Sequence, residues 1–265
     1  MIVYKSADEI RVMREASRIV ARILSELGSR IKPGVRTRDL DAYAESRARE
    51  LGAQPAFKGY RGFPASLCTS INEVVVHGIP SGRELKEGDI ISLDFGVEYQ
   101  GFFGDAAATY PVGRISPEAQ KLINAAEQGF NRGLDQLKAG QRVSDYSHAV
   151  QDYVEGLGLS VIRSFVGHGI GRALHEEPQV PNFGLPGRGP KVRSGLTLAL
   201  EPMIAAGQWE VEVLDDGWTA VTRDRSLTAH YEHTVALTDD GVEVLSRWDG
   251  PGSNAAGRTQ EKQYA

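Results

Sequence analysis

The sequence predicts one domain of the mixed α/β (α+β) class, built from two related halves. Three observations predict it. A set of residues recurs in the second half, strand signals are separated by glycine-rich turns typical of antiparallel connections, and helical patterns flank the strands in both halves. Because the repeat is long and occurs twice, it favours a single domain with internal pseudo-symmetry over a solenoid. We expect this domain to span residues 1–248.

The repeat consists first of six identical residues at an offset of 106 positions. They are Lys32, Gly34, Arg36, Asp39, Leu51 and Gly52, which match Lys138, Gly140, Arg142, Asp145, Leu157 and Gly158. An offset of 107 then places Gly88, Leu93 and Asp94 over Gly195, Leu200 and Glu201. Each half should therefore contain a strand that ends in a carboxylate, and the two copies should face each other around an acidic pair.

The elements can be predicted in order along the chain. Residues 8–27 carry apolar side chains at helical spacing, with Ser6 as N-cap and Gly28 as a stop signal, and a second helix should cover residues 37–51 and end at Gly52. Strands are predicted at residues 72–76, 89–97, 106–112, 196–200 and 234–237. Residues 178–195, rich in proline and glycine, predict an irregular surface loop, and residues 249–265 predict a disordered C-terminal tail.

Composition limits the classes of function. The chain has 265 residues, a net charge of −5 and no prominent cluster of lysine or arginine, so we expect no nucleic-acid partner. We expect no membrane association, because the sequence lacks the apolar segment of a signal peptide and any run near the ~18 apolar residues of a membrane span. The single cysteine, Cys68, excludes an internal disulfide and agrees with a reducing compartment, so we expect a cytoplasmic protein.

Asp94 and Asp105 lie eleven positions apart, with a turn near Tyr99-Gln100-Gly101 between them. This spacing predicts that they lie on neighbouring strands of a hairpin. Two carboxylates brought together in apolar surroundings repel each other, so the pair favours a bound metal or a shared proton. Taken alone, the two aspartates fit better with solvated side chains at strand ends, because charged residues tend to be exposed.

The second half adds a histidine and two glutamates. His168 is flanked by glycines, where the backbone can turn sharply and present the ring, although such a histidine alone is also consistent with a structural role. Glu201 ends one apolar strand and Glu232 lies beside another, and buried carboxylates need partners. Two aspartates, two glutamates and a histidine suit a pair of divalent ions bridged by carboxylates.

Over about residues 1–245, the sequence resembles the type I methionine aminopeptidases, a branch of the pita-bread peptidases. The resemblance rests on Gly-Tyr-Arg-Gly-Phe-Pro at 59–64 through His-Gly-Ile-Pro at 77–80, Gly-His-Gly-Ile-Gly at 167–171 with His-Glu-Glu-Pro at 175–178, Leu-Glu-Pro-Met at 200–203, and Tyr-Glu-His-Thr at 231–234. It implies the pita-bread fold, with pseudo-twofold antiparallel sheets flanked by helices. It also implies that two divalent ions, of cobalt, manganese, iron or zinc, are bound by Asp94, Asp105, His168, Glu201 and Glu232, with Asp105 and Glu232 bridging.

The resemblance also implies catalytic roles. His77 and His175, each of which alone would suggest a surface or core histidine, match the family's two active-site histidines that are not ligands. By resemblance, His175 donates a hydrogen bond toward the carbonyl oxygen, His77 contacts the scissile amide nitrogen, and Glu201 carries protons as well as binding metal.

An apolar pocket for a thioether side chain is implied at six matching positions: Phe57, Tyr60, Phe63, Cys68, Leu174 and Trp218. Ordinary core packing is the alternative at Phe57 and Leu174. Many relatives have cysteine at the position of Phe57 and a larger side chain at that of Leu174, and some have histidine at that of Arg61. These departures concern the shape of the pocket. Cys68 should be a pocket wall, since the metal chemistry needs no thiolate.

The implied function is removal of the initiating methionine from nascent polypeptides when the second residue is small. A proline-specific peptidase of the same fold would usually carry a large extra N-terminal domain, and non-catalytic relatives have lost metal ligands that this chain keeps. The resemblance favours a monomer of the short bacterial form, and contact with the ribosome follows only from the expected substrate.

Overall fold

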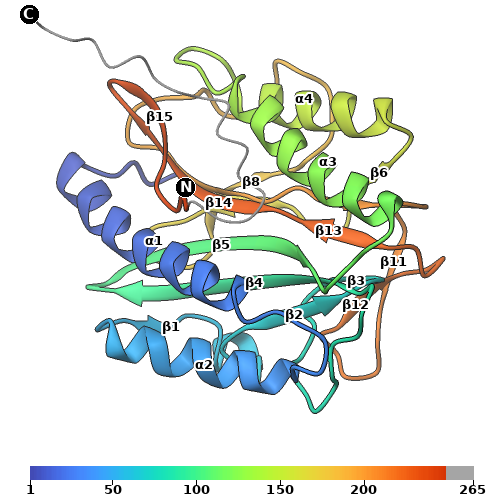
Figure 1. The fold of residues 1–265 in the computed structure, drawn as a ribbon. Helices are drawn as coiled ribbons and strands as arrows, with labels where there is room; N and C mark the ends of the chain where they lie inside the picture. Colours follow the sequence, from blue (N-terminus) through green and yellow to red (C-terminus); the bar gives the residue numbers. More distant parts are fainter. Residues whose placement is uncertain (249–265) are drawn as a thin grey trace, which may run out of the picture.

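The computed structural model describes residues 1–248, and the predicted tail at 249–265 lies outside these residues. Within the described part, a nine-stranded sheet carries its helices on one face (Figure 1). The helices are α1 (Ala7–Gly28), α2 (Thr37–Glu50), α3 (Pro117–Leu134) and α4 (Val143–Gly156), with a short 3-10 helix η1 (Tyr60–Gly62). None of the helices in residues 1–248 combines the length and apolar character that a membrane crossing needs.

The main sheet has the strand order β1-β4-β5-β14-β9-β7-β8, with β2 also paired to β4 and β15 to β14. Its strands are β1 (Gln54–Pro55), β2 (Cys68–Ile71), β4 (Ile90–Tyr99), β5 (Phe102–Pro111), β7 (Gly167–Gly169), β8 (Glu176–Val180), β9 (Thr197–Leu200), β14 (Glu232–Thr238) and β15 (Gly241–Val244). Two small three-stranded sheets complete the described part. They comprise β6 (Ser160–Val161), β10 (Met203–Ala205) and β13 (Thr228–His230), and β3 (Val74–Val76), β11 (Val211–Val213) and β12 (Ala220–Thr222).

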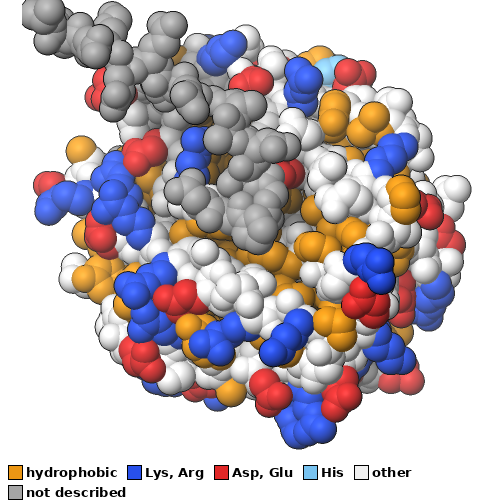
Figure 2. Space-filling view, viewed as in Figure 1, with side chains coloured by type: hydrophobic (Ala, Val, Ile, Leu, Met, Phe, Trp, Pro, Cys, Tyr) orange, Lys and Arg blue, Asp and Glu red, His pale blue; other side chains and the backbone are white. Residues whose placement is uncertain are grey.

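The predicted first helix is confirmed, and its N-terminus is capped from both sides. The Ser6 hydroxyl accepts a hydrogen bond from the Glu9 backbone N–H at 3.3 Å, and the Glu9 carboxylate accepts one from the Ser6 N–H at 2.7 Å. The buried face of α1 packs across β4 and β5. Gly104 of β5 allows this contact, because a Cβ there would lie 2.7 Å from the Ser17 backbone nitrogen. On the outer faces of α1 and α2, basic and acidic side chains are interspersed (Figure 2) and form pairs such as Arg22 with Glu26.

The pseudo-symmetry of the two halves is also confirmed. Helices α2 and α4 both have 14 residues, and they begin directly after the repeated residues Arg36 and Arg142. The repeated glycines before these helices share one left-handed conformation, with φ of 87° at Gly34 and 89° at Gly140. Because few other residues adopt positive φ at low cost, this backbone conformation explains why glycine recurs at both positions.

Two details of the symmetric arrangement were predicted wrongly. The equivalent strands β4 and β9 do not face each other, because β5 and β14 lie between them in the sheet. Asp94 lies in the middle of β4 and does not end it, whereas Glu201 directly follows β9. Strand β4 has 10 residues and β9 has 4, so β4 continues past its carboxylate whereas β9 stops before its own.

The segment 178–195 is not wholly an irregular surface loop, because it begins inside β8 with Val180 fully buried. Pro178 lacks a backbone N–H, which makes a proline-containing strand hard to predict. Here the register between β7 and β8 shifts after His168, so that His168 pairs with Gln179 while Gly169 pairs with Glu176. Pro178 lies at this irregularity, where no ladder hydrogen bond is required of it.

Candidate metal centre

The candidate carboxylates lie on the sheet face opposite the helices. Side chains alternate between the two faces along a strand. The odd-numbered residues of β4 pack in the core under α1 and α2, so the even-numbered Asp94 projects from the other face. In β14, Val235 and Leu237 pack in the core under α3 and α4, and Glu232 has the opposite parity. The predicted hairpin of Asp94 and Asp105 is confirmed as β4 and β5.

The strand register aligns Asp94 and Glu232 in one row across the sheet. Asp94 pairs with Cys68 of β2 on one side and with Ala107 of β5 on the other. Ala107 in turn pairs with Glu232 of β14. A small alanine therefore separates the two carboxylates and leaves space above the sheet between them.

A neighbouring row contains Asp105 and His168. The Asp105 backbone N–H donates to the Thr234 hydroxyl at 2.9 Å, and that hydroxyl donates back to the Asp105 carbonyl oxygen at 2.8 Å. Thr234 pairs with Ala199 of β9, and Ala199 pairs with His168 of β7. The five candidate ligands thus lie on, or directly after, five different strands. The residues between them in the sheet are Ala107, Ala199 and the hydrogen-bonded Thr234.

The glycines beside His168 serve close strand packing and do not form the sharp turn that we predicted. His168 lies inside β7, and neither neighbour has positive φ. A Cβ on Gly167 would lie 2.5 Å from the Ala199 carbonyl oxygen, and one on Gly169 would lie 2.2 Å from that of Glu177. Glycine is required here because the backbones of β8 and β9 approach β7 so closely.

Asp105, His168 and Glu232 each place one possible ligand atom within 4.8 Å of the others. Glu201 adjoins this group, since its Oε1 lies 3.4 Å from Nε2 of His168. The His168 Nδ1–H donates to the Gly169 carbonyl oxygen at 2.9 Å, which leaves Nε2 with a free lone pair. Burial lowers the pKa of His168 to about 4, so the ring is neutral at pH 7, as a metal ligand must be.

The carboxylates lack partners that would compensate for their burial. Among the described residues, Asp94 Oδ1, Asp105 Oδ1 and Glu232 Oε1 are buried oxygens without a hydrogen-bond partner. Burial raises the pKa of Asp94 to about 7. Burial and the neighbouring acidic groups raise the pKa of Asp105, Glu201 and Glu232 well above their usual range. Oxygen-rich buried clusters of this kind fit divalent cations, whose charge offsets the repulsion.

One cavity joins these groups to the predicted substrate pocket. Its free volume is about 140 Å³, which suits one side chain. The lining residues are Phe57, Tyr60, Arg61, Phe63, Cys68, His77, Asp94, Asp105, His168, Leu174, His175, Glu201, Trp218 and Glu232. Every predicted site residue therefore lies at this cavity, and Arg61 joins them.

The two predicted catalytic histidines approach the cavity from different elements. His175 lies in the loop before β8, with its Nδ1 2.9 Å from the Tyr60 hydroxyl and its ring centroid 4.2 Å from that of His168. His77 follows β3 with a φ of 60°, a costly conformation for a residue other than glycine. Trp218 and Phe165 contact its ring edge to face, with ring centroids 6.1 and 5.4 Å away. Burial lowers the pKa of His77, so its ring is neutral at pH 7.

Two residues near the centre were not predicted from the sequence. His230 is buried, its Nε2 has no hydrogen-bond partner in the described residues, and this atom lies 3.7 Å from Oε2 of Glu201. Asn182 donates from its side-chain amide to the Glu201 carbonyl oxygen at 3.0 Å. These two residues contact Glu201 from separate chain segments. The only sequence signal was for His230, which lies two positions before Glu232 and so could be expected on the same side of an extended chain.

A buried cluster of carboxylates and one histidine, on a pseudo-symmetric antiparallel sheet beside an apolar pocket, defines a metal-dependent hydrolase. The chain belongs to metallopeptidase family M24, whose family model matches residues 11–239. Within this family it is an aminopeptidase of the methionine aminopeptidase type, which confirms the resemblance seen in the sequence.

The relatives that support this assignment match almost the whole chain. A methionine aminopeptidase of Clostridium perfringens is 51% identical over 93% of this chain and 99% of its own. The crystal structure of the Thermotoga maritima methionine aminopeptidase superimposes with a TM-score of 0.92 at 45% identity, covering 94% of this chain and all of that one. A prolidase from Pyrococcus furiosus shares the fold, with a TM-score of 0.77 at 19% identity, but this chain covers only 66% of it.

Proposed function

We propose that this enzyme removes the initiating methionine from nascent polypeptides by hydrolysis assisted by two divalent metal ions. The observation that carries the proposal is the single cavity in which the oxygen-rich ligand cluster meets an apolar side-chain pocket. Such a cavity can hold one apolar side chain beside the reacting bond. The names of the relatives support methionine as that side chain.

In this proposal Asp94, Asp105, His168, Glu201 and Glu232 would hold the ions, and Asp105 and Glu232 would each serve both. Bound there, cobalt, manganese, iron or zinc would polarise the attacking water and the scissile carbonyl. The Glu201 carboxylate accepts a proton from the attacking water and passes it to the leaving amine. Asn182 holds the Glu201 backbone through its carbonyl oxygen, and the His230 ring lies beside the Glu201 carboxylate.

The histidines act on the reacting bond in this account. Each has a lowered pKa, His77 through burial and His175 through desolvation of its ring at the cavity and the neighbouring His168, so both rings are neutral at pH 7. A neutral ring still donates one N–H. We assign the N–H of His175 to the carbonyl oxygen as it gains negative charge, and we assign contact with the scissile amide nitrogen to His77.

The methionine side chain occupies the apolar part of the cavity in this proposal. Phe57, Phe63, Cys68 and Leu174 are buried there, and the Trp218 ring meets that of Phe63 edge to face at 5.2 Å. Burial and the nearby Asp94 carboxylate raise the pKa of the Cys68 thiol well above its usual range. Cys68 is therefore a neutral wall of the pocket and not a nucleophile.

We further propose that residues 1–248 form one catalytic domain and that the enzyme works as a cytoplasmic monomer. The main sheet draws strands from both halves of the chain, which supports a single domain. Nascent polypeptides are the substrate partner, so any contact with the ribosome would be transient.

We expect cleavage only when the residue after methionine is small, such as Ala, Gly or Ser. The resemblance implies a site that is tight beyond the scissile bond, and His77, His175 and Tyr60, which line the cavity, support this. Methionine release should be measured on Met-Ala-Ser and on peptides with Lys or Phe in second place, with Xaa-Pro peptides as the control for a proline-specific enzyme. Efficient release from Met-Lys or Met-Phe peptides would refute the size limit, and cleavage restricted to Xaa-Pro would refute the proposed substrate.

A further inference from the structure

Lys5, just before α1, has a buried ammonium group. Its side chain is 1% exposed, forms an ion pair with Glu176, and donates to the Val3 carbonyl oxygen at 2.9 Å. The Lys5 backbone N–H donates to the Gly195 carbonyl oxygen at 2.7 Å. Lysine is almost never this buried unless it is paired, because its desolvation is costly. The N-terminal segment is therefore anchored into the body of the protein at this residue.

Two glycines form the slot that receives Lys5. A Cβ on Gly171 would lie 2.1 Å from Lys5 Cε, and a Cβ on Gly195 would lie 2.7 Å from the Lys5 carbonyl oxygen. Gly171 is the last glycine of the motif at 167–171, of which the proposed metal centre uses only His168. The slot gives this glycine a role, because it allows the lysine stem to reach Glu176 at the end of the loop that carries His175.

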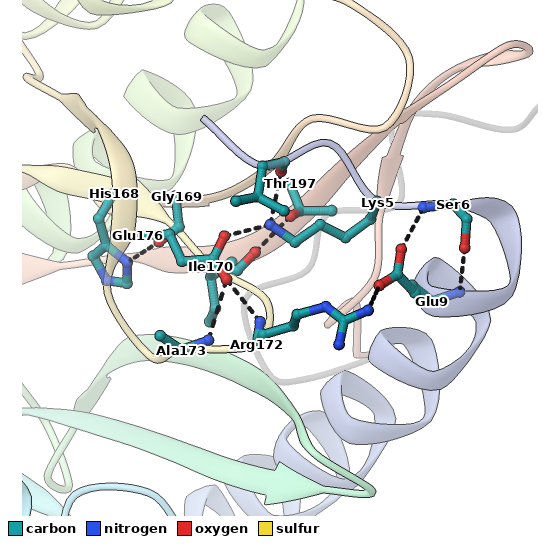
Figure 3. Close-up of polar contacts among 11 residues, drawn as sticks. Lys5, Ser6, Glu9, His168, Gly169, Ile170, Arg172, Ala173, Glu176 and Thr197 are labelled. Atoms are coloured by element: carbon teal, nitrogen blue, oxygen red, sulfur yellow. Dashed lines mark hydrogen bonds and ion pairs between the residues drawn. The ribbon is translucent and has the colours of Figure 1, made fainter. Parts of the chain in front are cut away.

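The partner of Lys5, Glu176, fastens the loop that leads to His175. Its Oε1 accepts hydrogen bonds from the backbone N–H groups of Arg172 at 2.7 Å and Ala173 at 3.1 Å. Figure 3 shows Lys5 and these two N–H groups converging on the Glu176 carboxylate from opposite sides. One carboxylate thus ties together the N-terminal segment and both ends of the segment 172–176.

This segment carries two residues of the proposed active site. Leu174 is 2% exposed and lines the side-chain pocket, while His175 reaches the cavity mouth against Tyr60. The residues just before this segment are held by other contacts. The Thr197 hydroxyl donates to the Ile170 carbonyl oxygen at 2.5 Å, and the Phe103 backbone N–H donates to the Gly171 carbonyl oxygen at 2.8 Å. The Lys5 and Glu176 pair restrains the downstream end of the segment, directly after His175.

We propose that Lys5 is a positioning residue, which acts through Glu176 to hold His175 and Leu174 in the geometry that catalysis needs. The inference rests on the proposed function, in which His175 supports the reaction. The N-terminal segment would then affect turnover without contacting the metal ligands. A catalytic group displaced by about 1 Å can lose ~100-fold in rate, so a lost restraint should be visible in kcat.

The test compares Lys5→Met, which keeps the stem length and removes the ammonium, with the wild-type enzyme. Methionine release by the wild type from Met-Ala-Ser is measured first, because its absence would refute the proposed function and not the role of Lys5. Lys5→Met should lower kcat by about 10- to 100-fold, with smaller change in KM and unchanged metal content. Arg172→Ala is the matched control. It removes an exposed contact between the same loop and Glu9, and should leave kcat within about twofold.

A double-mutant cycle distinguishes positioning from general stability. If Lys5 acts through His175, Lys5→Met should cost little further turnover in a His175→Ala background. An equal loss in both backgrounds would overturn the proposal. Lys5→Met together with Glu176→Gln removes both charges, so no unpaired charge stays buried, and should show the same loss of kcat with folding intact. Near-normal turnover of this double variant, or unfolding of both Lys5 variants, would also overturn it.

Discussion

Replacing Asp105 with Asn, or Glu232 with Gln, should lower turnover by several orders of magnitude and reduce the amount of bound metal. Each side chain is buried and presents an oxygen without a hydrogen-bond partner to the cavity. The amide has the same shape but no negative charge, so each substitution removes a charge that both ions are proposed to share. Turnover on Met-Ala-Ser and metal content should be measured on one preparation.

Asp89→Asn provides a matched control for these substitutions. Asp89 is also buried, but it accepts hydrogen bonds from the Asn72 side chain and the Lys86 backbone N–H, away from the cavity. Its substitution should affect stability more than metal content. Near-normal turnover with two ions bound in Asp105→Asn or Glu232→Gln would show that the bridging assignment is wrong.

His175→Ala should reduce turnover about 100- to 1,000-fold, or roughly 3 to 4 kcal/mol, the usual effect of losing one donor to a developing oxyanion. KM should change much less, because the interaction strengthens mainly in the transition state. His175 is exposed at the cavity mouth, so its removal should change the melting temperature little.

The competing interpretation makes His175 a sixth ligand or a structural residue. Its ring lies close to that of His168, so a ligand role is a real alternative. Turnover, bound metal and melting temperature separate these interpretations. A large fall in turnover with metal and folding retained supports the catalytic role, whereas loss of metal or stability in step with activity would exclude it.

The fold could be predicted where local signals were strong. The first helix has a capping box and a clear apolar face. The long strands β4 and β5 are rich in apolar residues over most of their length. The short strands β7 and β8 could not be recognised, because glycine and proline occupy positions where close packing and a register shift require them. The order of β4 and β9 in the sheet depends on long-range pairing, which an internal repeat does not specify.

The residues that line the cavity were predicted more completely than the order of the strands. Carboxylates in apolar strands are rare enough to stand out, and the matched motifs supplied His77, His175 and the pocket residues, all of which line the cavity. Residues that act on Glu201 from outside the motifs were missed. Asn182 lies in a segment predicted to be a surface loop, and the direction of the His230 ring depends on the small sheet of β10 and β13.

The central claim, hydrolysis of N-terminal methionine by a two-metal centre, is tested most directly by removing and restoring the metal. The enzyme should be stripped with a chelator and titrated with Co²⁺, Mn²⁺, Fe²⁺ or Zn²⁺, while methionine release from Met-Ala-Ser and metal bound per chain are measured together. We predict that release is lost with the metal and returns as binding approaches two ions per chain. Undiminished methionine release from protein shown to be free of metal would contradict the account.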